Sequence, residues 1–416
     1  MSLLSSLLIL IVSARLLGGL FSRLGQPAMI GEILAGVLLG PAVLDAIQPT
    51  PPLHGVSELA VFLIILSAGL EIRFSDIFGA LRGRGLVVAF VGFALPFAAG
   101  LLTGALFGED LMRTLFLGLC ISITALPVAV KLLDTLGILH TRIAHYALAT
   151  AVINDVAALF ILGILLNLPQ QESFAAILGT LGTASWKLIV LAAGVVALNQ
   201  LLEWLDRREI GIHAVPEALV RYFGPDALFG IVVIFVLVFG TLSEMLGFHF
   251  VIGAFFGALF LDQRHFLSSR YEELRGTLAS VTGGFLAPVF FAFLGLEFTT
   301  EAFDDLVFPV VVTLVSIVSK VAAGWLGGHL AGMSRQEALG LGCVLNGRGV
   351  MELVVAGIAY QKGFIGQSMF STLVLMGIVT TLLTPILFRR AYPGAALEQY
   401  RNSQMPDVPP SGDPRG

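Results

Sequence analysis

The sequence predicts an all-α polytopic membrane protein, on three observations: its composition, its long apolar stretches and an internal repeat. The 416-residue chain is 57% hydrophobic and only 12% charged, with a mean hydropathy of +0.94. A water-soluble protein of this length needs a polar outer shell and cannot cover so much apolar surface. A membrane β-barrel is excluded, because barrel strands alternate polar and apolar residues at every second position.

The apolar stretches are about 20 residues long, the length that crosses a bilayer as a helix. The N-terminal stretch has no positive n-region and no small-residue cleavage site, so we expect a first span there and not a signal peptide. About thirteen spans are predicted in all, at residues 3–22, 27–46, 56–73, 84–107, 112–133, 142–167, 174–203, 226–246, 248–262, 277–299, 306–330, 336–360 and 367–389.

An odd number of spans places the two termini on opposite sides of the membrane. Short cytoplasmic loops carry an excess of Lys and Arg. With the N-terminus outside, the outer loops hold little beyond Arg113 and Lys362, and the turn between Glu244 and His249 is also outside and solvated. The inner side then collects Arg23, Arg73, Arg82, Arg84, Arg142, Arg207, Arg208, Arg221, Arg264, Arg270, Arg275, Arg335, Arg389 and Arg390. We therefore expect an integral protein of the cell (inner) membrane with a cytoplasmic C-terminus.

Two motifs recur about seven spans apart and in the same order. "MIGEILAGVLLG" (29–40) resembles "VIGAFFGALFLD" (251–262), and "FLIILSAGLEIRFSDI" (62–77) resembles "FFAFLGLEFTTEAFDDL" (290–306). Because seven is odd, the two halves cross the membrane in opposite directions. Such an inverted repeat is typical of secondary transporters, whose substrate site lies near the midplane between the halves.

The same displacement relates "ITALPVAV" to "LNGRGVMEL", and each stretch has a helix breaker in its middle. Pro127 interrupts the first span, and Gly347 with Gly349 interrupts the second. Broken helices at corresponding positions of two halves indicate a transport site, where backbone carbonyls and half-helix ends face an ion.

Several polar side chains lie deep in predicted spans, where ionisable residues are usually functional. Asp155 follows Asn154 inside the long apolar run of residues 143–166. It is a candidate ion ligand, or a carboxylate that locks helices by pairing with a cation. Lys320 is a functional or a structural counter-charge. Thr124 either contributes to an ion site or bonds back to its own helix.

Arg348 and Glu352 are four residues apart on one helix, the spacing at which opposite charges meet. A pair that neutralises itself is the slightly favoured interpretation. Cys120 and Cys343 lie in predicted spans and show no disulfide or metal-site pattern, so we expect packing roles. No phosphate loop, zinc spacing or nucleophile elbow is present, so the sequence does not predict an enzyme.

Together these motifs resemble the monovalent cation:proton antiporter family CPA2, which includes Kef-type and plant CHX-type exchangers. "PAMIGEILAGVLLGP" resembles an early-span signature, "ITALPVAVKLLDTLGIL" with "AVINDVAAL" the broken helix and ion-binding aspartate, and "LNGRGVMELVVAGIA" the CHX-type pattern. The resemblance covers residues 1–390. It implies the inverted-repeat Na⁺/H⁺ antiporter-like fold, in which two broken helices cross.

The resemblance also implies a role for each candidate. Asp155 is the ligand shared by an alkali cation and a proton, and Asn154 replaces the first aspartate of electrogenic members. Thr124 and Pro127 form the unwound motif. The charge-compensating core residues are Lys320, Arg348 and Glu352. Gly347 and Gly349 belong to the facing broken helix. One carboxylate implies one-for-one, electroneutral exchange of K⁺ or Na⁺ for H⁺ by an elevator-type motion.

The implied organisation has a dimerising scaffold (1–80 and 225–300), a mobile core (84–170 and 306–391), a linker helix (174–204) and a short, disordered cytoplasmic tail (392–416). The implied partners are the lipid bilayer, the transported ions and a second copy of the chain. We expect no cofactor, no nucleic acid and no nucleotide-binding regulatory domain.

Two other transport functions use the same polar residues. A gated, channel-like K⁺ efflux system has no obligatory proton coupling. A Na⁺-coupled organic-solute symporter needs a roomier polar cavity than one Asp155/Asn154 centre. A ligand-sensing receptor built on a transporter fold has no positive sign in the sequence.

Overall fold

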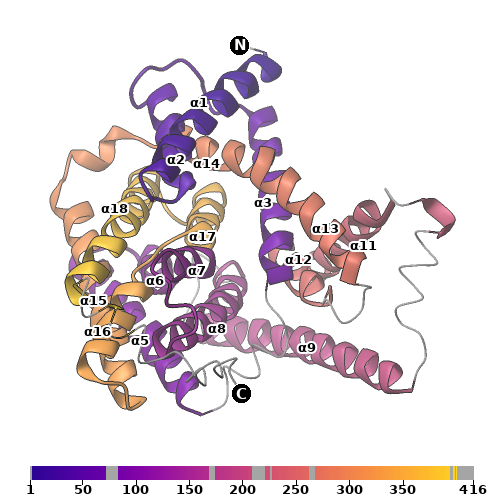
Figure 1. The fold of residues 1–416 in the computed structure, drawn as a ribbon. Coiled ribbons are helices and arrows are strands. Elements are labelled where there is room, and N and C mark those ends of the chain that lie inside the picture. Colours follow the sequence, from indigo (N-terminus) through magenta and orange to yellow (C-terminus); the bar gives the residue numbers. More distant parts are fainter. Residues whose placement is uncertain are drawn as a thin grey trace, which may run out of the picture. The chain divides into compact units, whose positions relative to one another are not determined.

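The computed structural model describes residues 2–71, 83–167, 174–208, 221–224, 227–261, 268–393, 397–398 and 400. Within these residues every regular secondary-structure element is a helix (Figure 1). The α-helices are α1 (Leu3–Arg23), α2 (Ala28–Leu39), α3 (Pro51–Glu71), α5 (Arg84–Leu106), α6 (Leu111–Ser122), α7 (Leu126–Thr135), α8 (Arg142–Leu165), α9 (Phe174–Arg207), α11 (Ala227–Met245), α12 (Phe250–Leu259), α13 (Ser268–Val281), α14 (Ala287–Leu296), α15 (Val307–Leu330), α16 (Arg335–Leu345), α17 (Val350–Gln361) and α18 (Gln367–Ala391).

The predicted all-α membrane-spanning class is confirmed, although the described residues contain fewer apolar spans than the thirteen predicted. In the described ranges, nine helical segments are long and apolar enough to cross a bilayer. The α16–α17 pair adds a broken span bent by 43°, and α2 and α12 are shorter apolar helices. Each of the thirteen predicted ranges contains a helix. Three of those ranges, 112–133, 277–299 and 336–360, contain two helices each, because a break or a π-helical turn interrupts them.

The chain divides into two compact units. Unit 1 comprises Met1–Ile77, Ala157–Asp304 and Gly357–Ser371, and unit 2 comprises Phe78–Val156, Asp305–Ala356 and Thr372–Gly416. In unit 1, α2 and α14 pack so closely that a Cβ atom on Gly36 would lie 1.8 Å from the carbonyl oxygen of Ala292. Small residues permit this backbone contact in membrane bundles. The glycines of the repeated 29–40 motif therefore have a packing role.

Unit 2 is built around α5 and α15, which pack on each other and on the two half-helices α6 and α16. A Cβ atom on Gly100 would lie 2.6 Å from the Cα atom of Gly118, and one on Gly324 would lie 2.3 Å from the Cα atom of Gly342. Larger side chains at these positions would push the half-helices outward. The glycines thus place the ends of α6 and α16 beside α5 and α15.

An apolar cluster packs around the N-terminal end of α8 in unit 2. It includes Leu133, Ile143 and Leu341, together with Tyr392 and Tyr400 from the predicted tail. The tail was expected to be disordered, but its described residues pack: Tyr392 is 3% exposed and Tyr400 9%. Residues 394–396, 399 and 401–416 lie outside the described part of the chain.

Candidate functional site

The first break lies between α6 and α7, where Ile123 and Ala125 are extended (ψ 144° and 116°). Pro127 is in the first turn of α7 and has no amide hydrogen, so the Ile123 carbonyl loses its usual helical partner. Together with the C-terminal end of α6, this leaves four successive carbonyls, from Cys120 to Ile123, to be satisfied from elsewhere.

Two buried cations bind those four carbonyls. Nη1 of Arg348 donates to the oxygens of Cys120 (2.7 Å) and Ile123 (2.6 Å), and its Nη2 donates to that of Ile121 (2.6 Å). The Lys320 ammonium donates to the Ser122 carbonyl. Cations at a helix C-terminus also offset the negative end of its dipole. The unwound carbonyls are therefore already occupied by this chain's own side chains.

The second break comprises Asn346–Gly349 and crosses the first. The Ala125 amide donates to the Gly347 carbonyl across 3.1 Å, so backbone joins backbone at the crossing. A Cβ atom on Gly349 would lie 2.5 Å from that of Ala125, and one on Gly347 would lie 3.1 Å from Cγ1 of Val128. The two glycines therefore have two roles: they interrupt the helix, and they allow this close approach.

Threonines of α18 hold the second break. The Thr381 hydroxyl accepts from the Arg348 amide (3.3 Å) and donates to the Arg348 carbonyl (3.1 Å). Nδ2 of Asn346 donates to the Thr380 carbonyl (3.2 Å) and to the Thr384 hydroxyl (3.1 Å). Sequence reasoning missed this set, although Thr380 and Thr384 share a helix face in an apolar span, which is a detectable signal.

The Thr124 hydroxyl joins four elements at the crossing. It accepts from Nζ of Lys320 (2.7 Å) and Nδ2 of Asn154 (3.4 Å), and it donates to the Leu345 carbonyl (3.4 Å). The structure thus brings Thr124, Asn154 and Lys320 together. Asp155 follows Asn154 on α8, is 4% exposed and interacts electrostatically with Lys320.

Lys320 has three N–H donors, and each has an oxygen partner: the carbonyls of Gly92 (3.1 Å) and Ser122, and the Thr124 hydroxyl. None of these is a carboxylate. Lys320 therefore holds the first break in place while it contributes positive charge near Asp155. Neither Gly92 nor Ser122 could be found from sequence, because both act through the main chain.

Arg348 and Glu352 form the expected pair, with Nε and Oε2 3.7 Å apart and both side chains fully buried. The other guanidinium nitrogens bind the α6 carbonyls and the Ser316 hydroxyl (2.6 Å). Only Nε faces the carboxylate. The pair adds no net charge to the crossing. Removing either partner would leave a buried charge uncompensated.

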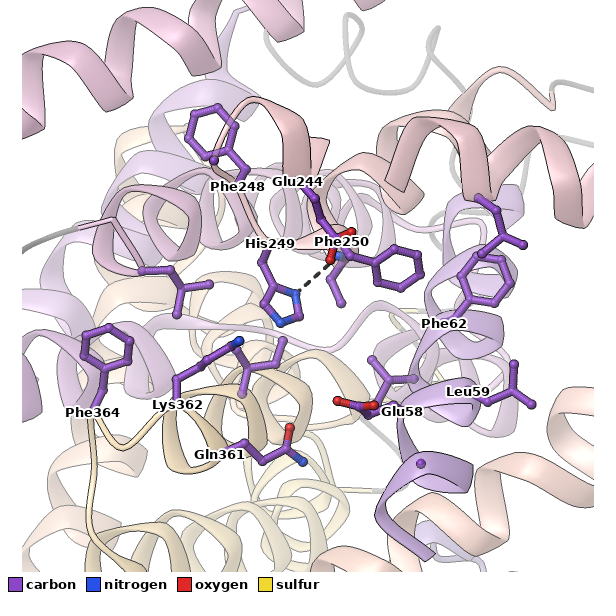
Figure 2. Close-up of a pocket in the computed structure, with 17 residues that line it drawn as sticks. Glu58, Leu59, Phe62, Glu244, Phe248, His249, Phe250, Gln361, Lys362 and Phe364 are labelled. Atoms are coloured by element: carbon purple, nitrogen blue, oxygen red, sulfur yellow. Dashed lines mark hydrogen bonds between the residues drawn. The ribbon is translucent and has the colours of Figure 1, made fainter. Parts of the chain in front are cut away.

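A separate cavity of about 610 Å³ lies in unit 1 and contains none of the predicted site residues (Figure 2). Glu58, Glu244, His249 and Lys362 line it together with aromatic rings. Nδ1 of His249 accepts from the Val251 amide at 3.3 Å. Burial, and secondly the charge of Lys362, lower the pKa of His249 to about 4. His249 is thus half-buried and neutral, whereas a solvated side chain was expected.

Comparison with known proteins places this geometry in a family. The model of the sodium/hydrogen exchanger transmembrane family matches residues 8–389. The Na(+)/H(+)-K(+) antiporter GerN of Bacillus cereus is 26% identical over 92% of this chain and 95% of its own. The K(+)/H(+) antiporter 1 of Saccharomyces cerevisiae is 27% identical over 92% of this chain and 45% of its own.

The sodium proton antiporter MjNhaP1 of Methanocaldococcus jannaschii has the same fold. Its solved structure superimposes with a TM-score of 0.69 at 18% identity, covering 96% of this chain and 98% of that one. The family match covers both breaks and all the predicted spans except residues 3–7 of the first. This chain belongs to the sodium/hydrogen exchanger family, whose members are membrane transporters and not enzymes.

Proposed function

We propose that this protein exchanges Na⁺ or K⁺ for H⁺ across the membrane, and that the Asp155 carboxylate carries the cation and the proton in turn. The observation that carries the proposal is the crossing itself. It places α8, with Asn154 and Asp155, beside Thr124 of one break and the Leu345 carbonyl of the other. The antiporter names of the relatives support the same reaction.

Side-chain oxygens on α8 supply the further ligands. Oδ1 of Asn154 and Oγ1 of Thr150 are buried and accept no hydrogen bond from any described residue. The two residues are four apart, so they share a face of α8. Buried polar atoms in native structures nearly always have a partner. A dehydrated alkali cation, which prefers oxygen ligands, satisfies both oxygens beside the Asp155 carboxylate.

The buried charges favour one-for-one exchange. With Asp155 ionised, the four ionisable groups around the breaks sum to zero, because Lys320 balances Asp155 and Arg348 balances Glu352. Binding either one proton or one monovalent cation at Asp155 changes this sum by the same amount. Both loaded forms therefore carry equal charge through the membrane, and exchange is electroneutral.

The transport cycle follows from the division into units. Every predicted site residue lies in unit 2. We infer that unit 2 is the mobile core, that unit 1 is a scaffold that dimerises, and that exchange occurs by an elevator-type motion. The N-terminus lies outside the cell membrane and the C-terminus lies on its cytoplasmic side, as the arginine distribution predicts. Cysteine accessibility at either end and cross-linking of two copies test these inferences.

The test uses purified protein in liposomes with an imposed pH gradient and an internal pH dye. Added Na⁺ or K⁺ should collapse the gradient in the wild type, and the effective ion is the substrate. Asp155→Asn should abolish this response, whereas Asp134→Asn, an exposed carboxylate on α7, should not. Proton-independent flux of ²²Na⁺ or ⁸⁶Rb⁺ would instead favour the channel-like alternative. Coupling to an organic solute would favour a symporter.

Electroneutrality has its own measurement. The wild-type rate with the effective ion should not change when the membrane potential is clamped at different values by an ionophore and a gradient of an ion that the protein does not transport. Asn154→Asp adds a second carboxylate and should make the rate depend on the potential. A potential-dependent wild type would contradict the one-for-one stoichiometry and leave the exchange itself standing.

A further inference from the structure

The N-terminal end of α8 is completed by a side chain from the C-terminal tail. The Ile143 amide, in the first turn of α8, donates to the Tyr400 hydroxyl at 3.4 Å. The neighbouring Ala144 amide donates to Oγ1 of Thr141 at 3.4 Å. The first amides of a helix have no intrahelical acceptor and need caps. Two residues, 259 positions apart in the chain, therefore share the capping of α8.

Tyr400 is held in place by an aromatic ladder. Phe388 and Tyr392 stack with ring centroids 5.4 Å apart, and Tyr392 and Tyr400 follow at 5.3 Å. Tyr392 also fits against α16, where a Cβ atom on Gly340 would lie 2.7 Å from its ring. Burial raises the pKa of Tyr400, so its hydroxyl keeps a proton. The ladder thus links the end of α18 to α16 and α8.

The same two helices reach the proposed ion site further along, α8 at its middle and α16 at its C-terminal end. Asn154 lies eleven residues beyond Ile143 on α8, about 16 Å along the helix. Leu345, whose carbonyl accepts from Thr124, lies five residues beyond Gly340 on α16, about 7 Å along. The Asn154–Thr124 and Thr124–Leu345 hydrogen bonds are both 3.4 Å long. Because both contacts are already long, a displacement of α8 relative to α16 would weaken them further.

We propose that Tyr400 is a positioning residue for cation binding: by capping α8 against α16, the tail sets the relative position of Asn154 and the Leu345 carbonyl. The inference rests on the proposed exchange function and adds a residue outside the membrane-spanning helices to it. An ion pair between Arg142 and Glu337, 3.9 Å apart, joins the same ends of α8 and α16. With its atoms 3.9 Å apart and Arg142 exposed, this link is weaker than the buried ladder.

The test compares Tyr400→Phe with Tyr222→Phe in the liposome exchange assay. The first removes only the capping hydroxyl, and the second removes the hydroxyl of a tyrosine in unit 1 that is 83% exposed. Tyr400→Phe should raise the KM for the cation by about threefold to tenfold, the size of a lost helix cap, with little change in maximal rate. Tyr222→Phe should behave as the wild type.

Thr141→Val supplies a second check, because it removes the other cap of the same helix end and a side-chain hydrogen-bond partner of Tyr400. It should also raise KM, and the double variant should raise it by a factor different from the product of the two single effects. Hydrogen–deuterium exchange of a peptide covering residues 141–150 should be faster in Tyr400→Phe than in the wild type. This readout does not depend on transport.

Several outcomes would overturn the inference. They are an unchanged KM in Tyr400→Phe, an equal shift in Tyr222→Phe, and a lower unfolding temperature with KM and maximal rate both unaffected. If the wild type shows no cation-driven proton movement, the proposed function fails instead. The exchange data for peptide 141–150 then still report whether Tyr400 caps α8.

Discussion

The amide of Ala125 and the carbonyl of Gly347 form a 3.1 Å hydrogen bond between two chain segments that are each locally unwound. The bond joins the middle of one broken span to the middle of another, 222 residues later. Around it, the side chains of Arg348, Lys320 and Thr124 bind the main-chain oxygens that the breaks expose. The crossing is therefore a hydrogen-bonded unit with no room for larger residues.

The crossing should not tolerate a methyl group at Gly349. Its Cβ atom would lie 2.5 Å from that of Ala125, and neither backbone can give way without losing the Ala125–Gly347 bond. Gly349→Ala should destabilise the protein by about 1–3 kcal/mol and abolish exchange. Gly276→Ala is the matched control: no atom lies within 4 Å of its Cβ position in α13, so it should be neutral or slightly stabilising. Thermal unfolding in detergent measures both, and equal effects would contradict the steric argument.

Arg348 should not be replaceable by lysine. An ammonium keeps the charge but cannot bind three α6 carbonyls and the Ser316 hydroxyl with the fork geometry of a guanidinium. Arg348→Lys should lower stability by roughly 3 kcal/mol, because each buried acceptor that loses its donor costs about 1–3 kcal/mol. At Arg113, whose exposed pairs with Glu109 and Asp110 are worth less than about 1 kcal/mol, the same change should have little effect. A tolerated Arg348→Lys would show that charge alone suffices.

Cation binding should depend on the hydroxyl of Thr124 and not on its methyl group. The hydroxyl accepts from Lys320 and Asn154 and donates to the Leu345 carbonyl. Thr124→Val leaves those groups without this partner and should raise the cation KM about tenfold or more, since unpaired buried polar groups cost about 1–3 kcal/mol. Thr124→Ser should retain exchange. In Thr135→Val the lost bond is only to the Lys131 carbonyl on an exposed helix face, so transport kinetics should not change. A valine variant as active as the serine variant would contradict the assigned contacts.

Because of His249, the free energy of unfolding should decrease as the pH falls into the mildly acidic range. Its pKa is about 4 in the folded protein, against an ordinary value of 6.5, because burial and Lys362 disfavour the charged ring. Above pH 6.5 both states are neutral and His249 adds no pH dependence. As the pH falls from 6.5 towards 4, only the unfolded chain takes up the proton, so stability is lost across this window.

The measurement for His249 is the unfolding temperature of the wild type and His249→Gln between pH 4 and pH 8. The difference between them should be constant above pH 6.5 and shift in favour of the variant below it. Lys362→Gln should narrow the window by raising the histidine pKa towards its ordinary value. A difference that is constant over the whole range would show that His249 is not buried as described.

Much of the fold follows from the sequence, because hydropathy over 20 residues is a local quantity. Each of the thirteen predicted ranges contains a helix, and the breaks at Pro127 and at Gly347–Gly349 lie where the breakers predict them. The pairing of Arg348 with Glu352 is also local, since residues four apart share a helix face. The residue types that interrupt an apolar span were visible without any tertiary information.

The partners of those residues were decided only by tertiary structure. Arg348 binds carbonyls 225 to 228 residues away, and Lys320 reaches Gly92 at a separation of 228. A main-chain carbonyl has no residue-type signal, so Gly92 and Ser122 could not be singled out. The tail is a second example, because its Pro-rich, polar composition predicts disorder. In the structure, the Tyr400 ring packs in an apolar cluster made by distant helices, and its hydroxyl caps α8. Local propensity and hydropathy thus determine which segments span and where they break, whereas long-range packing determines which oxygen each buried cation and each helix end binds.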